Sequence, residues 1–449
     1  MIETQPVAVL SRKTSASVAV AIERAFAVRR QAAGLSVHRR SASLREIAAG
    51  VRQRREEFAR IIASEGIKTI REARLEADRC ATTFELSAEE CSRLGGETVA
   101  FDQVPKGDGR IGWWSRRPLG VVAGLTPYND PLNLVAHKLG PAIAAGAPII
   151  AKPHPRTPSV ALELSRLAAA TDLPAGMVQV ITGGADVALA LAKDPRIAVV
   201  SFTGGRRAGA AIAQVAAGKR LVMEMGGVCA SVVAKDADLV HATEALASGI
   251  VSAAGQNCVH TQRIDVEAEI FDELSQRLVA KLGSLRVGEQ LAEATDVGPL
   301  LDEKHAKNVE DIIRDAVSLG ARVLCGATRD GRFLSPTLVT DVPENHPLLT
   351  EEMFAPVAAI RSGKSMSGII EAVASSGHMI NASIFTQRLD LILAFRNVVE
   401  AGAIIVNDST DFRIDAMPFG GNGEAGLGRE GVRFAIESLT ERQLICLRA

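Results

Sequence analysis

The sequence predicts an α/β protein organised around a parallel, doubly wound sheet. From residue 120 to residue 224, short apolar segments of strand length alternate with segments of helical periodicity, which is the pattern of βαβ units. Polar or glycine residues follow several of these strand-like segments directly. Parallel sheets bind ligands in the crevice beyond the carboxyl ends of their strands. This shared placement therefore indicates a nucleotide site.

The composition indicates an ordinary globular protein with more than one domain. A chain of 449 residues, 47% of them hydrophobic, is too long for one core, so we expect two or three domains. The 51 Lys and Arg residues nearly balance the 52 Asp and Glu residues, which leaves no overall field to attract nucleic acid or an acidic membrane. The N-terminus has no signal-peptide pattern, and no apolar run approaches the length of a membrane span. We therefore expect a cytoplasmic protein that binds neither nucleic acid nor membrane.

The first part of the chain is expected to be helical and to cover a sheet. Three helices are expected there, over 17–33, over a long run that ends at Gly66, and over about 70–94. Ser43 and Glu46 have the spacing of a capping box ahead of the second run. None of these helices carries a motif with chemical meaning.

Both tryptophans, Trp113 and Trp114, lie in a strand-like segment from about 100 to 117. Paired large aromatics in a short strand belong either to a core or to a subunit contact, and the sequence favours neither. The residues 443–447 also have strand character.

Strands and helices alternate through two regions of the chain. The strands expected in the first region are 121–125, 147–151, 177–181, 197–202 and 220–223, and the helices are 131–145, 159–170, 185–193 and 208–217. In the second region, which begins near residue 230, the expected helices are 242–254, 271–282 and 308–318, and the expected strands are 263–266 and 321–324. No linker separates the regions, so we expect them to pack tightly together.

Cys258 is the main candidate for catalysis. It lies in a polar turn, Gly255-Gln-Asn-Cys258, and the upstream carboxylate of Glu224 is a candidate base. A thiol needs a base or a lowered pKa to act as a nucleophile, and His260 shares a face with Cys258 only if the segment is extended. The alternative is that Cys258 is a buried apolar residue and Glu224 a solvated acid. Because Cys258 and His260 lack the further ligands of a zinc site, no metal is expected.

Polar residues at strand ends are weaker candidates. Asn129 follows a strand, where its side-chain NH₂ group suits a developing oxyanion, although locally a turn residue is the simpler interpretation. Lys152 also ends a strand, where a lone Lys is usually a solvated charge. Gly204 and Gly205 form a strand-to-helix turn that brings backbone NH groups toward a phosphate.

Taken together in chain order, these segments resemble the aldehyde dehydrogenase superfamily. The matching residues are Pro118, Thr126-Pro-Tyr-Asn129, Lys152-Pro153, Leu173-Pro-Ala-Gly176, Phe202-Thr-Gly-Gly205, Glu224-Met-Gly-Gly227, Gly255-Gln-Asn-Cys258, Glu352-Met-Phe-Ala-Pro356 and Pro418-Phe-Gly-Gly421 to Gly431. The spacing of Glu224 and Cys258 also fits the family.

The resemblance implies a three-part fold. A Rossmann-like cofactor domain is expected over 1–99 and 118–226, and an α/β catalytic domain over 227–426. A small β oligomerisation element, over 100–117 and 437–449, would then join subunits into a homodimer or homotetramer.

The resemblance also implies roles in the NAD(P)-dependent oxidation of an aldehyde to a carboxylic acid. Cys258 attacks the aldehyde carbon, Asn129 and the Cys258 backbone NH hold the oxyanion, and Glu224 activates the water that hydrolyses the thioester. Lys152 binds the adenosine ribose or its 2′-phosphate, while Glu352 holds the nicotinamide ribose and Phe354 packs near the ring. The other cofactor-binding residues that it implies are Thr126, Pro127, Tyr128, His154, Gly204, Gly205 and Gly226.

Departures from the family pattern bear on the cofactor. Pro155, between His154 and Arg156, replaces a carboxylate that commonly grips both ribose hydroxyls. Loss of this anion eases the acceptance of a 2′-phosphate, so both NAD and NADP are expected as cofactors. The other departures are Tyr128 for the usual Trp, and Gly205, Gly423 and Ala425 in their loops, none of them at the nucleophile, the base or the oxyanion donor.

The segment 411–418 is similar to the branch of lactaldehyde, phosphonoacetaldehyde and glyceraldehyde-phosphate oxidisers. Arg413 would then meet an anionic or hydroxylated group, and the sequence predicts a small polar or acidic aldehyde. The alternative is that Arg413 and Asp415 brace the loop against each other.

The same residues disfavour three other functions. A CoA-acylating dehydrogenase typically lacks the glutamate, so Glu224 disfavours it. A catalytically silent relative is disfavoured by the intact set of Cys258, Glu224 and Asn129. A plain hydrolase lacks a histidine partner for the thiol beyond His260.

Overall fold

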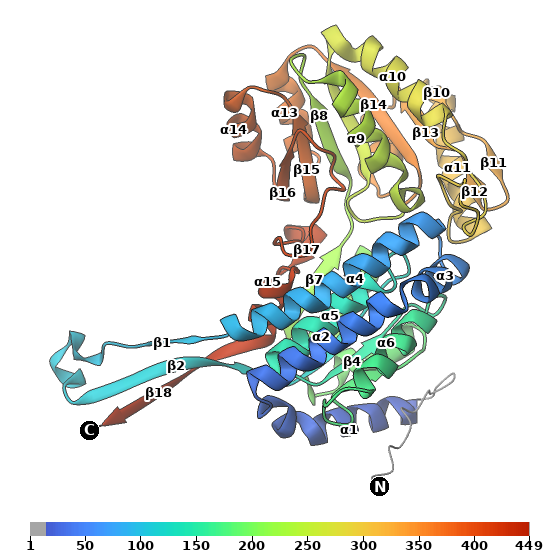
Figure 1. The fold of residues 1–449 in the computed structure, drawn as a ribbon. Helices are drawn as coiled ribbons and strands as arrows, with labels where there is room; N and C mark the ends of the chain where they lie inside the picture. The colour runs from blue at the N-terminus through green and yellow to red at the C-terminus, as the bar shows by residue number, and fades with distance from the viewer. Residues whose placement is uncertain (1–14, 449) are drawn as a thin grey trace.

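The computed structural model describes residues 15–448, which form two lobes and a projecting arm (Figure 1). Each lobe is built around its own mainly parallel sheet with helices packed against it. This confirms the predicted α/β fold class. Residues 1–14 and Ala449, which the expected domain ranges include, lie outside the described residues. None of the described helices is long and apolar enough to cross a membrane.

The first sheet has the strand order β17-β7-β6-β3-β4-β5. Its strands are β3 (Val121–Leu125), β4 (Ile149–Lys152), β5 (Val178–Val180), β6 (Ile197–Gly204), β7 (Arg220–Met225) and β17 (Gly426–Leu427). Strands β3 to β7 pair in parallel, and β17 is antiparallel to β7. The chain builds from β3 outward through β4 and β5 and then returns to the other side of β3 with β6 and β7. The switch point therefore lies between β3 and β6, and a ligand crevice is expected at their carboxyl ends.

Helices cover both faces of this sheet. One face packs against α2 (Val37–Gln53), α3 (Arg55–Glu65), α4 (Ile70–Glu90), α5 (Asn133–Ala145) and α6 (Ser159–Ala169). The other face packs against α1 (Ser15–Ala33), α7 (Ala185–Lys193) and α8 (Arg206–Val215). Neighbouring residues of β3 point to opposite faces, with Val122 in one core and Val121 and Ala123 in the other.

The capping box expected at Ser43 is wrong. Helix α2 begins well before Ser43, which is a buried residue inside the helix. The upstream turn of α2 packs on α4, where the hydroxyl of Ser41 donates a hydrogen bond to the carbonyl of Ala88 (2.9 Å), so tertiary contacts extend the helix. A capping box does form at the start of α4, between Thr69 and Glu72.

The second sheet has the order β10-β13-β14-β9-β8-β15-β16. Its strands are β8 (Cys229–Val233), β9 (Thr261–Glu267), β10 (Arg322–Cys325), β13 (Thr337–Thr340), β14 (Val357–Gly363), β15 (Met379–Phe385) and β16 (Ala401–Val406). All pairs are parallel except β10 with β13. The helices around it are α9 (Leu239–Val251), α10 (Phe271–Gly283), α11 (Glu303–Ser318), α12 (Pro347–Thr350), α13 (Met366–Ala374) and α14 (Leu389–Val398), and a short hairpin is formed by β11 (Arg329–Asp330) and β12 (Phe333–Leu334).

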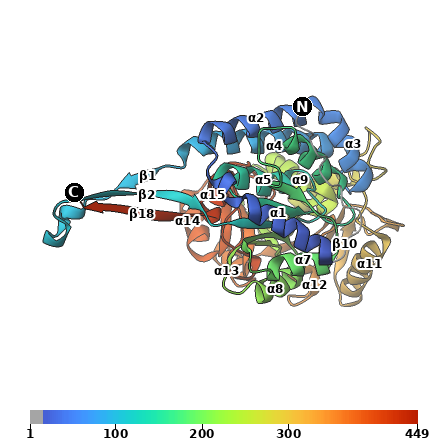
Figure 2. The ribbon, with the colours of Figure 1, turned by 90° about the horizontal axis from the view of Figure 1, so that it is seen from below.

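The arm is an antiparallel sheet that extends away from both lobes (Figure 2). It contains β1 (Gly96–Thr98), β2 (Arg110–Pro118) and β18 (Thr440–Arg448), and the helix α15 (Val432–Leu439) leads into β18. The strand expected over 100–117 is wrong in its first half, because residues 101–103 and 105–107 form short 3₁₀ turns. Trp113 on β2 is 41% exposed, so its ring is only partly covered within this chain.

Substitution of Phe84 tests the packing of α4 against the first sheet. Its side chain is fully buried in the core that α4 shares with α5. Phe84→Ala should lower the free energy of unfolding by about 3–5 kcal/mol, because the cavity adds to the lost burial. Leu75→Ala, at a 63% exposed position on the same helix, should change it by less than about 0.5 kcal/mol. Urea unfolding curves measure both, and equal losses would contradict this account of the core.

Candidate active site

The loop that follows β3 carries the first group of predicted residues. Asn129 is buried here, and its side-chain Oδ1 has no hydrogen-bond partner. The hydroxyl of Thr126 is likewise buried without a partner. Pro127 follows Thr126, and the Tyr128 hydroxyl donates to Oε1 of Gln256 in the second lobe (3.2 Å). Unsatisfied buried polar atoms are rare in folded proteins, so their presence at the sheet's switch point indicates a place built for a ligand.

The turn that carries Cys258 is left-handed. Helix α9 ends at Val251, and the φ angles of Ala253, Ala254 and Gly255 are +52°, +53° and +69°. Such angles are costly for residues other than glycine, about 1–3 kcal/mol each. Glycine is required at 255, where a Cβ atom would overlap the carbonyl of Ala355. Cys258, which follows this strained turn, is half-buried.

Charged groups from distant segments surround the Cys258 thiol. Burial raises the pKa of the thiol well above its ordinary value, and the nearby Arg413 guanidinium lowers it. The carboxylates of Glu352 and Glu224 raise it further. The structure therefore brings the predicted nucleophile, base and Arg413 into one electrostatic neighbourhood. The thiol needs a proton acceptor before it can react.

His260 is a poor candidate for that acceptor. Its imidazole is buried, and burial lowers its pKa to about 4. Its nearest polar neighbours are the backbone at Ile250 and the side chain of Gln262. This placement does not favour a thiol–imidazole pair.

Glu224, near the end of β7, has the environment of a general base. Its side chain is 1% exposed, and neither carboxylate oxygen has a hydrogen-bond partner. Burial, and then the nearby Glu430, raise the pKa of Glu224 well above its ordinary value. Gly420 allows the carboxylate to lie this close to the backbone, because a Cβ atom there would be 2.5 Å from Glu224 Oε1. A buried, unpaired carboxylate with a raised pKa is typical of proton transfer sites.

Sequence reasoning missed a buried ion pair beside Glu224. Lys138 of α5 pairs with Glu430, and its Nζ also donates to the hydroxyl of Thr203 (2.8 Å). Burial alone would raise the pKa of Glu430, but Lys138 holds this pKa down to about 2. The signal in the sequence was a lysine inside the mainly apolar helix α5, since charged residues are rarely buried unless paired.

The Arg413 side chain is 10% exposed and extends from the loop before Phe419. Its guanidinium stacks on the Phe419 ring (3.7 Å to the ring centre) and lies 3.6 Å from Glu430 Oε2 and 3.3 Å from His137 Nε2. Its Nε has no partner. The alternative that Arg413 braces Asp415 does not describe this arrangement, because Asp415 is held by other residues of α4 and α5. Those residues are Arg79, Asn133 and His137.

Several cofactor candidates gather beyond the carboxyl ends of β3 and β4. The Tyr128 ring makes edge contacts with His154 (5.3 Å between ring centres) and with Phe354 (6.1 Å). Lys152 donates to the carbonyls of Pro153 and Gly183, both at 3.0 Å, and burial lowers its pKa. Burial lowers the pKa of His154 to about 4.

The remaining candidates lie at the adjoining strand ends. Gly204 ends β6, and Gly205 precedes α8 with open space on its Cβ side. Glu352 packs directly against Gly226, where any side chain would overlap its carboxylate. Burial raises the pKa of Glu352 to about 7, and its Oε1 lacks a partner. An open helix N-terminus, a free carboxylate and aromatic rings fit a dinucleotide with phosphates, ribose hydroxyls and a flat ring.

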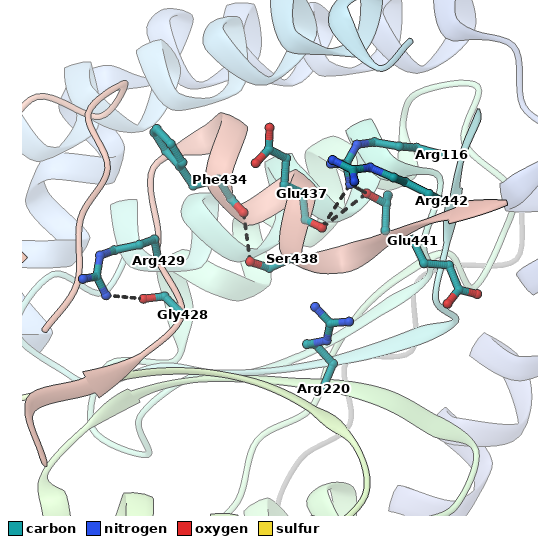
Figure 3. A pocket seen from close by; sticks show the side chains of 10 residues that line it. Arg116, Arg220, Gly428, Arg429, Phe434, Glu437, Ser438, Glu441 and Arg442 are labelled. Carbon is teal, nitrogen blue, oxygen red and sulfur yellow. Dashed lines mark hydrogen bonds between the residues drawn. The ribbon is translucent and has the colours of Figure 1, made fainter. Parts of the chain in front are cut away.

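A separate cavity of about 630 Å³ lies where the arm meets the first lobe (Figure 3). Figure 3 shows the Arg220 side chain pointing toward Ser438 of α15, with Arg116 and Arg442 close together near the base of β18. None of the residues that line this cavity is a predicted site residue. Within residues 15–448, no group of three His, Cys, Asp or Glu side chains is placed to hold a metal ion.

Comparisons with known proteins point to one family. The aldehyde dehydrogenase family model matches residues 2–445. Aspartate-semialdehyde dehydrogenase 1 of Pseudomonas canavaninivorans is 41% identical over 418 residues, 93% of this chain and 89% of that protein. 3-Sulfolactaldehyde dehydrogenase of Priestia aryabhattai is 39% identical over 395 residues, 88% of this chain and 83% of that protein.

The fold is similar to solved structures over nearly its whole length. The glyceraldehyde-3-phosphate dehydrogenase GapN of Methanocaldococcus jannaschii, complexed with NADP, has a TM-score of 0.94 and 34% identity, covering 98% of this chain and 96% of that one. These matches confirm the predicted branch. The chain belongs to the aldehyde dehydrogenase family and is an oxidoreductase that uses NAD or NADP to oxidise an aldehyde to a carboxylic acid.

Proposed function

We propose that Cys258, Glu224 and Asn129 carry out this oxidation, and that the substrate is a small aldehyde with an anionic group. The observation that carries the proposal is the unpaired, buried carboxylate of Glu224, which acts electrostatically on the Cys258 thiol. A carboxylate buried without a partner is costly, and a role in proton transfer accounts for its presence.

The proposed reaction has two stages. The Cys258 thiol releases its proton to solvent, and the thiolate attacks the aldehyde carbon. The resulting oxyanion accepts hydrogen bonds from the Asn129 side-chain NH₂ and the Cys258 backbone NH. A nicotinamide held in the site would supply the acceptor for the hydride that leaves this carbon, and loss of the hydride leaves a thioester on Cys258. Glu224 then takes a proton from water as the water oxygen attacks the thioester carbonyl, and Cys258 leaves as the carboxylic acid forms.

The cofactor is proposed to lie along the carboxyl ends of the first sheet. Lys152 binds the adenosine ribose, Glu352 the nicotinamide ribose, and Phe354 packs beside the nicotinamide ring. The surrounding positions are Thr126, Pro127, Tyr128, His154, Gly204, Gly205 and Gly226. The bonds of Lys152 go to carbonyl groups rather than to a carboxylate, which leaves its charge available to a 2′-phosphate. This supports the use of NADP as well as NAD.

Arg413 is proposed to bind the anionic group of the substrate. It is a largely buried cation whose Nε lacks a partner, and it acts on the Cys258 thiol. Three of the similar proteins point the same way, because aspartate semialdehyde, 3-sulfolactaldehyde and glyceraldehyde 3-phosphate all carry an anion. Others are lactaldehyde dehydrogenases, whose aldehyde is neutral. An arginine suits carboxylate, sulfonate and phosphate groups alike.

We further propose that the arm joins two or more copies of this chain and that the protein works in the cytoplasm. Ile111, Trp113, Leu444 and Leu447 are exposed apolar residues on β2 and β18, and β18 is an edge strand of its sheet. An exposed apolar edge strand favours association. The balanced charge of the chain leaves no overall field to attract it to an acidic membrane.

Cys258→Ala is the direct test of the mechanism. It should lower kcat by about three orders of magnitude or more, because no other group forms the covalent intermediate. Cys325→Ala, at another half-buried cysteine, is the control and should retain activity. Product analysis with and without coenzyme A completes the test. An acid product in both cases supports the proposal, and an acyl-CoA product would replace it with the acylating reaction.

Arg413→Met should change substrate preference. The kcat/KM for an acidic semialdehyde should fall by about 10- to 100-fold more than the value for a neutral aldehyde of the same length, because a charged hydrogen bond to substrate is lost. Arg413→Lys keeps the charge and should recover part of this preference. Equal losses for the two aldehydes would show that Arg413 acts only on the thiol or the loop.

Cofactor affinity should depend on pH through Glu352. With a pKa of about 7, its carboxyl group is neutral below that pH and anionic above it. Since the anion is the stronger acceptor for ribose hydroxyls, the Kd for NADP should fall by about tenfold as pH rises from 6 to 8. Glu352→Gln should flatten this dependence, and Glu351→Gln, at an exposed neighbour, should keep it. Fluorescence titrations measure the Kd for NADP of the unchanged enzyme and of both variants at each pH. A pH dependence in Glu352→Gln equal to that of the unchanged enzyme would reject the assignment.

A further inference from the structure

Helix α4 contacts both loops of the proposed catalytic site, although no residue of the helix belongs to either loop. Two carboxylates one turn apart, Glu72 and Glu76, point from its first turns into the junction of the lobes. Glu72 bonds to the turn before Cys258, and Glu76 bonds to the end of the Asn129 loop. The helix is therefore in contact with the nucleophile side and the oxyanion side at once.

Glu72 uses its two oxygens for two different tasks. Its Oε2 accepts hydrogen bonds from the backbone NH and the hydroxyl of Thr69 (2.9 and 3.0 Å), which closes the capping box of α4. Its Oε1 accepts a hydrogen bond from the backbone NH of Ala253 (2.7 Å). Ala253 is the first of the three left-handed residues that lead to Cys258. The carboxylate thus supplies the acceptor for an NH group of the strained turn that follows the end of α9.

Glu76 fixes the opposite side. Its Oε1 accepts from the backbone NH groups of Leu132 (2.7 Å) and Asn133 (3.0 Å), which are at the start of α5. Its Oε2 accepts from Lys68 (2.9 Å), and Lys68 also pairs with Asp130, the residue after Asn129. These contacts are buried, so the loop of Asn129 is attached to α4 by charge-assisted bonds.

Contacts between the lobes keep α4 in place. The backbone NH of Ile70 donates to the carbonyl of Gln290 in the second lobe (2.7 Å). The two loops also touch directly, because Gln256 Oε1 accepts from both the Tyr128 hydroxyl and the backbone NH of Leu301 (2.9 Å). The spacing of the two loops is therefore set by α4 on one side and by Gln256 on the other.

We propose that Glu72 is a positioning residue of the catalytic site, which holds the left-handed turn so that the Cys258 thiol and the Asn129 amide meet the same carbonyl group. This inference rests on the roles proposed above for Cys258 and Asn129. Oxyanion stabilisation needs donors within about 2.7–3.1 Å of the oxygen, and a displacement of about 1 Å can lower a rate 100-fold. Glu72 acts through the backbone and touches no reacting atom.

Glu72→Ala and Thr69→Ala separate positioning from helix capping. Both variants weaken the capping box, but only Glu72→Ala removes the bond to Ala253. We expect Glu72→Ala to lower kcat by about 10- to 100-fold, with the Kd for NADP changed less than about twofold, since the turn lies outside the proposed nucleotide contacts. Thr69→Ala should lower Tm by a similar amount and keep kcat within about twofold of the unchanged enzyme.

Hydrogen exchange supplies a readout that a purely capping role would not change. Exchange in a peptide covering residues 250–258 should be faster in Glu72→Ala and unchanged in Thr69→Ala. If the two variants lose activity equally and exchange alike at 250–258, the positioning role is overturned. Cys258→Ala, measured beside them, distinguishes this failure from a failure of the proposed mechanism, since an active Cys258→Ala enzyme would overturn the mechanism itself.

Discussion

Burial of charge at the junction of the two lobes is the constraint on which the site depends. Glu224 has no hydrogen-bond partner, and the nearby cations Lys138 and Arg413 offset part of the cost of its burial. Lys138 is itself balanced by Glu430. Removing one member of a buried pair costs about 3–5 kcal/mol because the other charge is left uncompensated. The groups around Glu224 therefore stabilise the fold and set the proton affinity of the proposed base together.

Backbone strain at the same junction positions the proposed nucleophile. The left-handed turn before Cys258 is unfavourable for two alanines, and it persists because distant elements fix it. Gly255 removes a clash with Ala355, and Glu72 satisfies the NH group of Ala253. Because these contacts fix the strained turn, the Cys258 thiol has one orientation relative to the first sheet. A loop free to relax would place the thiol in several positions, only some of which suit attack.

Local pattern was enough to predict the first sheet, and long-range contacts explain what was missed. Helix 185–193 matches α7, and the glycine and polar residues after the strands do lie at the switch point. Strands β8 and β15 were missed. Like β3 and β4 they are buried along their whole length and lack alternation, but Ser231 in β8 and Asn381 and Ser383 in β15 interrupt their apolar runs. Lys138 and Glu430 are 292 residues apart, and Glu72 and Ala253 are 181 apart. No spacing rule connects such residues, and only the folded chain shows that they meet.

The charges around Cys258 also order the proposed steps. Arg413 is the cation that acts on the thiol most strongly, while Glu352 and Glu224 oppose its ionisation. A thiolate beside an ionised Glu224 would place two negative charges in a poorly solvated space, so the two groups lose their protons most easily at different times. Attack on the aldehyde moves the negative charge from sulfur to oxygen, and departure of the hydride removes it. The thioester is neutral. From that stage Glu224 can ionise and act as a base without a second negative charge on the Cys258 sulfur, which leaves only when water attacks the thioester.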